Sequence, residues 1–144
     1  MRDYAVPLAV AAGILAFAAW WTPDGDENDG TAASHEVCIV TNVVDGGTFD
    51  CEPLGRVRPI LIDSLEVGEP GAEAATQYTT ETLLGETVEL ERDVSDRGPY
   101  GRLLRYVWLD GRLWNAEIVA AGHAEVAVYP PDTKHEEQIR NAAR

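Results

Sequence analysis

Basic residues are scarce in this sequence of 144 residues, and Lys134 is its only lysine. The chain holds 11 lysines and arginines against 25 aspartates and glutamates, so its formal charge at pH 7 is −14. This balance argues against a nucleic-acid binder held by a broad basic face. It suggests a halophilic protein that net negative charge keeps soluble in concentrated salt. A compositional bias of the lineage explains the same numbers equally well.

Several patterns that mark common enzyme classes are also missing. The chain contains no glycine-rich phosphate-binding loop, no serine nucleophile elbow and no internal repeat. His35, His123 and His135 form no zinc-ligand spacing with the two cysteines, so each is expected to be a surface or packing residue. Hydrophobic residues make up 45% of the chain, which argues against disorder throughout and predicts one domain with a short extension.

The extension begins with an apolar segment. Residues 5–21 are 17 residues without a charge, preceded by Arg2 and followed by a stretch rich in acids. This asymmetry predicts that the N-terminus lies inside the cell and that the rest is extracytoplasmic. The length is at the lower limit for a membrane span and exceeds a typical signal-peptide core. Residues 1–21 are therefore a cleaved signal or, as we favour, a retained hydrophobic helix that anchors the protein in the membrane.

Residues 22–34 combine proline, glycine, serine and four acids without hydrophobic periodicity, which is typical of a flexible linker. We expect the folded domain to span residues 35–144. It contains 20 acids and 10 bases, so the acidity belongs to the domain as well as to the linker.

The domain reads as strands first and helices later. Alternating and β-branched residues predict strands over 37–44, 48–51, 57–62, 87–91 and 103–109. In the strand over 87–91, Val88 and Leu90 are expected to point inward and Glu89 and Glu91 outward. Helices are expected over 71–84, over 116–121 with Asn115 as the N-cap, and over 132–143. This order predicts an α+β fold with a five-stranded OB-fold barrel and about three helices.

Cys38 and Cys51 flank the turn sequence Asp45, Gly46, Gly47. If the flanking runs form a hairpin, the two thiols come near each other, and an exported chain can oxidise them to a disulfide. Two buried free thiols are the alternative, because an offset of a residue or two in the register prevents bonding.

Two arginines and two carboxylates stand out at predicted strand ends and turns: Arg58, Asp63, Glu66 and Arg102. Guanidinium groups stay charged and donate paired hydrogen bonds to phosphate oxygens. Carboxylates bind hard cations or orient a water. The spacing alone is weak evidence, because such pairs more often form surface ion pairs.

The chain resembles the staphylococcal nuclease (thermonuclease) family over roughly residues 36–144. The matching segments are 44–48 (VDGGT) for the family's VDGDT turn, 58–66 (RPILIDSLE) for its arginine-to-glutamate run, 100–102 (YGR), 115–117 (NAE), 122–126 (GHAEV) and 129–136. Several spaced motifs in the right order are far more specific than any one of them.

The resemblance implies an OB-type barrel that hydrolyses DNA and RNA phosphodiesters with calcium. It assigns Arg58 and Arg102 to the phosphate and to the transition state. It assigns Glu66 to the attacking water. Asp63 and the carbonyl of Ser64 would bind calcium, with Asp45 contributing through water. Tyr100 and Tyr129 are candidates to pack against the sugar or base, although either could be a core residue. We expect a monomer.

One departure concerns the metal. The family's second aspartate of the turn, a direct calcium ligand, is Gly47 here. Fewer ligand charges weaken calcium binding. Three outcomes follow: weaker metal use with residual activity, rescue by Asp45 or a rearranged turn, or a barrel that binds single-stranded nucleic acid or a protein without cutting. If the domain is a nuclease, its activity should survive or rise with salt.

Overall fold

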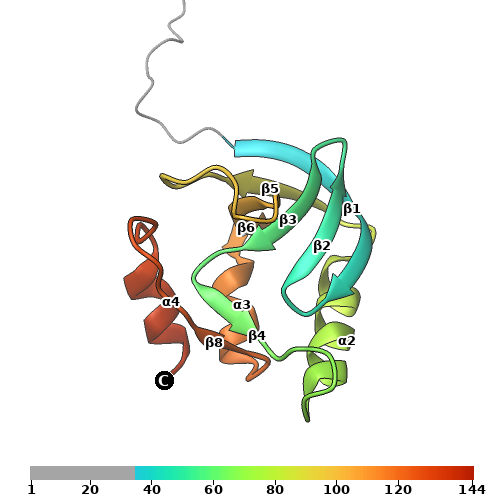
Figure 1. Ribbon diagram of the computed structural model, residues 1–144, viewed down its shortest axis with the longest axis vertical. Coiled ribbons are helices and arrows are strands. Elements are labelled where there is room, and N and C mark those ends of the chain that lie inside the picture. Colours follow the sequence, from blue (N-terminus) through green and yellow to red (C-terminus); the bar gives the residue numbers. More distant parts are fainter. Residues whose placement is uncertain (1–34) are drawn as a thin grey trace, which may run out of the picture. The chain divides into compact units, whose positions relative to one another are not determined.

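The computed structural model describes residues 35–144, and the segment and linker expected over residues 1–34 lie outside the described residues. Its elements follow in chain order: β1 (His35–Asp45), β2 (Thr48–Glu52), β3 (Gly55–Pro59), β4 (Ile62–Ser64), α2 (Ala72–Leu83), β5 (Thr87–Glu91), β6 (Leu103–Leu109), β7 (Arg112–Leu113), α3 (Trp114–Ala120), β8 (Ala124–Val126) and α4 (Glu136–Ala142). The three helices lie beside the strands, as Figure 1 shows.

Five strands form a closed barrel. They pair in the order β3-β2-β1-β5-β6, and the parallel pairing of β3 with β6 joins the two ends of the sheet. The 11-residue strand β1 pairs with both β2 and β5, and two register shifts in its pairing with β2 mark irregularities that help it bend. The predicted fold class, a five-stranded barrel with three helices, is confirmed.

Much of the predicted element order is also confirmed. The Asp45, Gly46, Gly47 turn joins β1 and β2, and β5 and β6 have the predicted bounds. Cys38 and Cys51 form a disulfide between β1 and β2 with their Cα atoms 5.5 Å apart, so they are not free thiols. Both are buried in the core.

The single strand predicted over 57–62 is wrong, because the chain bends within it. β3 ends at Pro59, Leu61 has a φ of 67°, and β4 begins at Ile62 and pairs with β8. Arg58 and Asp63 therefore lie on separate strands, Arg58 on β3 before the bend and Asp63 on β4 after it.

Asn115 is not the N-cap that the sequence predicted. It is fully buried within α3, where its Oδ1 accepts the N–H of Val107 at 2.8 Å and its Nδ2 donates to the carbonyl of Ile60 at 2.8 Å. It therefore ties β6 to the bend that follows β3. Since Ile60 lies between Arg58 and Asp63 in the chain, the buried amide of Asn115 helps to fix the backbone positions of both residues.

Two further predictions are corrected. The last helix begins at Glu136 and not at residue 132, because Asp132 is buried and accepts backbone N–H groups from another loop. Glu91, predicted to point outward, is only 2% exposed because the segment before α4 covers it. Within residues 35–144, no helix combines the length and the apolar character needed to cross a membrane.

Candidate functional site

A groove of about 480 Å³ lies where three parts of the chain meet. Its walls are the β3–β4 bend, the loop between β5 and β6, and the C-terminal segment before α4. Arg58 and Arg102 are its two basic lining residues, and Tyr129 and Asp132 line it from the C-terminal side. A groove with two guanidinium groups is suited to an anion.

Arg58 projects from β3 and is mostly buried, with 19% of its side chain exposed. Its Nη1 donates to the carbonyl of Pro59 at 2.9 Å, and its Nη2 lies 3.4 Å from Asp63 Oδ1. Burial lowers the pKa of Arg58, the positive charge of Arg102 lowers it further, and Asp63, Asp45 and Tyr129 act in the opposite direction. An arginine stays protonated nevertheless, so this is a partly desolvated cation that an incoming anion would stabilise.

Arg102 stands immediately before β6. Its Nη1 donates to Thr48 Oγ1 at 3.0 Å, and its guanidinium lies 5.7 Å from the centre of the Tyr100 ring. Within residues 35–144 it forms no ion pair with a carboxylate. The hydroxyl of Thr48, directly after the β1–β2 turn, therefore orients this guanidinium while its charge remains available.

The β1–β2 turn packs closely against β4 and α2. A Cβ on Gly46 would lie 2.9 Å from the Cβ of Ala75, so this position requires glycine. A Cβ on Gly47 would lie 3.0 Å from Ser64 Oγ and 3.3 Å from Arg58 Nη1, both polar ends of side chains that can shift by a few tenths of an ångström. The turn thus brings position 47 beside Ser64 and Arg58, which the family resemblance assigns to the metal and to the phosphate.

The carboxylates expected to bind a metal are Asp63 and Asp45. The side chain of Asp63 is 58% exposed, whereas Asp45 Oδ1 already accepts the N–H of Gly47 at 2.9 Å. Within the part of the chain that the structure describes, no group of three histidine, cysteine or acidic side chains is placed to hold a metal. Calcium prefers six to eight oxygen ligands, and ligand charge tunes its affinity.

The remaining predicted residues lie outside or at the edge of the groove. Glu66 follows β4 on an exposed loop, where its N–H donates to Glu69 Oε1 at 2.7 Å, and it is not among the residues that line the groove. Tyr129 lines the groove and is 66% exposed, and Tyr100 is 82% exposed. Neither tyrosine is a core residue, so both rings are open to a ligand.

Asp132 is a site residue that the sequence did not indicate. Its Oδ1 accepts the N–H groups of Val94 at 2.9 Å and Ser95 at 2.8 Å, which ties the C-terminal segment to the loop that carries Arg102. No local pattern could have revealed it, because its partners lie 38 and 37 residues earlier in the chain.

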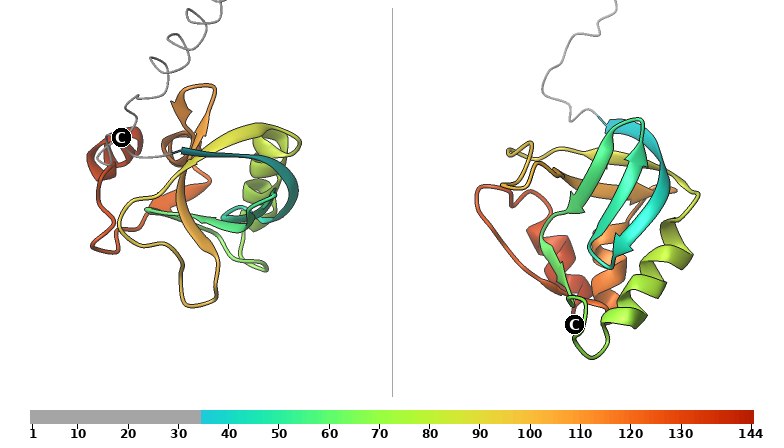
Figure 2. Two further views of the ribbon diagram at one scale, coloured as in Figure 1. Left: turned by 90° about the horizontal axis from the view of Figure 1, so that it is seen from above. Right: turned by 45° about the vertical axis from the view of Figure 1, so that its right-hand side comes forward.

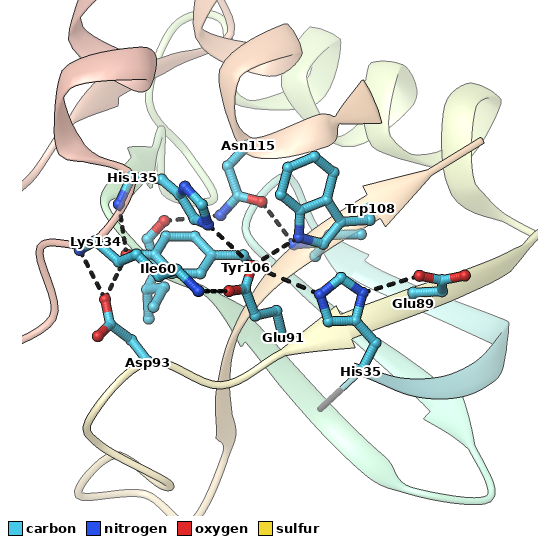
Figure 3. A network of polar contacts seen from close by, with 11 residues as sticks. His35, Ile60, Glu89, Glu91, Asp93, Tyr106, Trp108, Asn115, Lys134 and His135 are labelled. Atoms are coloured by element: carbon cyan, nitrogen blue, oxygen red, sulfur yellow. Dashed lines mark hydrogen bonds and ion pairs between the residues drawn. The ribbon is translucent and has the colours of Figure 1, made fainter. Parts of the chain in front are cut away.

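A second network holds the C-terminal segment before α4 to the barrel, as Figure 3 shows. Glu91 accepts hydrogen bonds from Trp108 Nε1 at 2.9 Å and from Lys134 Nζ, and its Oε1 lies 2.9 Å from His135 Nε2. Its carboxylate also lies 3.9 Å from His35 Nε2. Burial acts to raise the pKa of Glu91, but the hydrogen bonds from Lys134, Trp108 and His135 together lower it to about 2. This carboxylate is therefore ionised and links the first and last parts of the domain.

Comparisons with known proteins point to one family. The model of a family described as "Staphylococcal nuclease homologue" matches residues 56–144. The chain is 32% identical to a thermonuclease of Staphylococcus intermedius over 95% of its own length and 87% of the relative. It is 30% identical to a thermonuclease of Staphylococcus hyicus over 78% of the chain and 72% of the relative. Endonuclease YncB of Bacillus subtilis (strain 168) is 35% identical over 67% of the chain and 51% of the relative. The family resemblance read from the motifs is confirmed.

Proposed function

The chain belongs to the staphylococcal nuclease family, and on this basis we propose that it is a nuclease that hydrolyses DNA or RNA phosphodiester bonds. The observation that carries the proposal is the pair Arg58 and Arg102. They line one groove, and Arg102 has no carboxylate partner among residues 35–144.

The two guanidinium groups would bind the phosphate that is cleaved. Both stay charged, and both are held in place before the substrate arrives, Arg58 by the carbonyl of Pro59 and Arg102 by Thr48. Preorganised donors stabilise charge that develops in a transition state without reorganising at the moment of reaction. As water attacks, negative charge grows on the phosphoryl oxygens, so the arginines bind the transition state more tightly than the ground state.

Glu66 would act as the general base. Its loop position leaves the carboxylate exposed, where it can accept the proton of the attacking water as the new P–O bond forms and the bond to the leaving oxygen breaks. Tyr100 and Tyr129 would pack against the sugar or base next to this phosphate, because their exposed rings flank the arginines.

The family typically uses calcium. Asp63, the carbonyl of Ser64 and, through water, Asp45 would hold the ion here, and when bound it would add positive charge at the phosphate. We propose that Gly47 makes this binding weak and the nuclease attenuated, since the turn lacks a second ligating carboxylate.

Gly47, which replaces a ligating aspartate of the family, also favours one alternative function. Without a strong metal site, the barrel would act as a non-catalytic OB module that binds single-stranded nucleic acid or a protein partner. Such a module would bind equally well in the presence of a chelator, whereas the nuclease would lose activity.

We propose further that the domain works outside the cytoplasm, tethered through residues 5–21 or released after their cleavage. The Cys38–Cys51 disulfide supports this location because disulfides persist in oxidising compartments.

The test uses the full-length chain with single-stranded DNA and RNA, in calcium and in a chelator. We expect calcium-dependent cleavage, a loss of at least 100-fold for Glu66→Gln, and near-wild-type rates for Glu73→Gln, an exposed glutamate in the first turn of α2. Absence of cleavage by the wild type at every calcium concentration would contradict the proposal.

A further inference from the structure

The few basic side chains of this domain are unevenly placed. Outside the region of the groove, each of four basic side chains is paired with a carboxylate: Arg56 with Asp50, Arg112 with Glu117, Lys134 with Glu91, and Arg140 with Glu136. Half of the ten bases in residues 35–144 instead line one of two neighbouring grooves, and these are Arg58, Arg92, Arg97, Arg102 and Arg105. In a domain with twice as many acids as bases, this concentration needs an explanation.

Three of these arginines line a second groove, of about 350 Å³. Arg105 lies at the bottom of this groove, with 5% of its side chain exposed. It pairs with Glu36 at 3.1 Å and with Asp96 at 2.8 Å. These two carboxylates are the acids among the lining residues. The groove therefore contains three positive and two negative side chains, and its deepest arginine is already neutralised.

The other two arginines keep charge available at the rim. Arg92 donates to the carbonyl of Val94 at 3.3 Å and forms no ion pair within the described residues. Arg97 donates to the carbonyl of Gly101 at 2.8 Å, and its only carboxylate contact in residues 35–144 is Asp96 at 4.0 Å. Arg105, Arg92 and Arg97 together hold the pKa of Asp96 below its ordinary value. The excess of positive charge thus sits where a ligand can reach it.

The two grooves share the β5–β6 loop as a common wall. Gly98 and Arg102 line the first groove, and Asp96 and Arg97 line the second. The bond from Arg97 to Gly101 places the rim of the second groove one residue from Arg102. Figure 2 shows this loop, in gold, projecting from the barrel. A ligand that continues past Arg102 over the loop therefore arrives at Arg97 and Arg92.

We propose that the second groove binds a backbone phosphate of a single-stranded polynucleotide whose cleaved phosphate lies at Arg58 and Arg102. The proposal rests on the proposed function for the location of the cleaved phosphate. A single strand is favoured over a duplex because it must bend over the loop, and duplex DNA is stiff over a persistence length of about 150 base pairs. Arg92 supplies a guanidinium that pairs with no carboxylate of residues 35–144, and a guanidinium matches phosphate geometry.

The alternative is that the second groove is only an ion-pair network that holds the loop. Arg105 and Asp96 have that role in either case, since Arg105 also donates to the carbonyl of Asp96 at 3.0 Å. Substitution of Arg92 distinguishes the two explanations, because the Arg92 side chain contributes only one long hydrogen bond to the structure of the loop.

The experiment compares the full-length wild type with Arg92→Glu, and with Arg112→Glu as a matched control on a distant hairpin. Binding of fluorescent oligothymidylate of 12 nucleotides is measured by anisotropy in a chelator between 0.1 and 0.5 M salt, and cleavage of 2- and 12-nucleotide substrates is measured in calcium. We expect Arg92→Glu to weaken 12-mer binding at least fivefold and to change the slope of log K against log salt by about 0.7, the value for one single-strand phosphate contact. Cleavage of the 2-mer should stay within twofold, and Arg112→Glu should match the wild type in every measurement.

Binding of the 12-mer by Arg92→Glu within twofold of the wild type would overturn the inference, even if both proteins cut. Loss of binding in Arg92→Glu from a wild type that cuts nothing would support the inference and contradict the proposed nuclease. A wild type that neither binds nor cuts would overturn both.

Discussion

Replacing Glu91 by glutamine tests how the C-terminal segment is held to the barrel. The change keeps the shape of the side chain and removes its charge. Glu91 is 2% exposed and interacts with Trp108, Lys134 and His135 (Figure 3). All three partners would lose a charge-assisted interaction, and the segment that carries Lys134 and His135 would be less firmly attached.

The size and pH dependence of the effect follow from the pKa of Glu91. The folded protein lowers it from 4.5 to about 2, and at 1.36 kcal/mol per pKa unit this corresponds to about 3 kcal/mol. Because the pKa is lower in the folded state, the stabilisation is complete above the unfolded value of 4.5 and is lost as the pH falls from 4.5 to about 2. Glu91→Gln should therefore lower the free energy of unfolding by about 2 to 3 kcal/mol at pH 7, and by much less near pH 2.

The assay is urea unfolding followed by tryptophan fluorescence at several pH values between 2 and 7. Glu89→Gln is the control, because Glu89 lies on the same strand but is exposed, with its contact to His35 at the surface. We expect this control to change the free energy of unfolding by less than about 0.5 kcal/mol. A loss for Glu91→Gln that is equal at pH 2.5 and pH 7, or no loss at all, would show that the charge of Glu91 does not stabilise the fold.

Three further predictions concern the turn and the disulfide. Gly47→Asp should raise calcium affinity at least about tenfold over Gly47→Asn in a calcium titration of the cleavage rate, and equal affinities would contradict the account of the metal site. Gly46→Ala should lower the free energy of unfolding by about 1 to 3 kcal/mol, because its Cβ would lie 2.9 Å from that of Ala75, and Gly47→Ala should cost less than half as much. Cys38→Ser should cost about 3 kcal/mol, since Cys38 and Cys51 are 13 residues apart, and a wild type whose unfolding midpoint is unchanged by reductant would contradict this.

The sequence predicted those features that depend on local patterns. The hairpin around Asp45, the strands β5 and β6, and the barrel class followed from alternation, turn residues and element order. The arginine pair was accessible for a different reason, because Arg58 and Arg102 stand in short motifs shared with a family.

The features that the sequence missed depend on contacts between distant segments. Asn115 appeared to be a helix cap, yet it bridges β6 and the β3–β4 bend. Glu91 sits on the outer face as alternation predicted, but the segment around His135 covers it. Asp132 appeared to be part of a helix and instead binds the loop of Arg102. Tertiary packing decides the environment of each of these polar side chains, and no local window contains their partners.

Single-turnover cleavage of a 12-nucleotide single strand measures whether Arg58 and Arg102 act together on one phosphate. Arg56→Gln is the matched control, since Arg56 lies two residues before Arg58 on β3 but is paired with Asp50 outside the groove. We predict that Arg58→Gln and Arg102→Gln each lower the cleavage rate by about 100- to 1000-fold, with the unfolding midpoint measured for every variant, and that Arg56→Gln leaves the rate within twofold. Rates for Arg58→Gln and Arg102→Gln that equal the rate of Arg56→Gln would contradict the account.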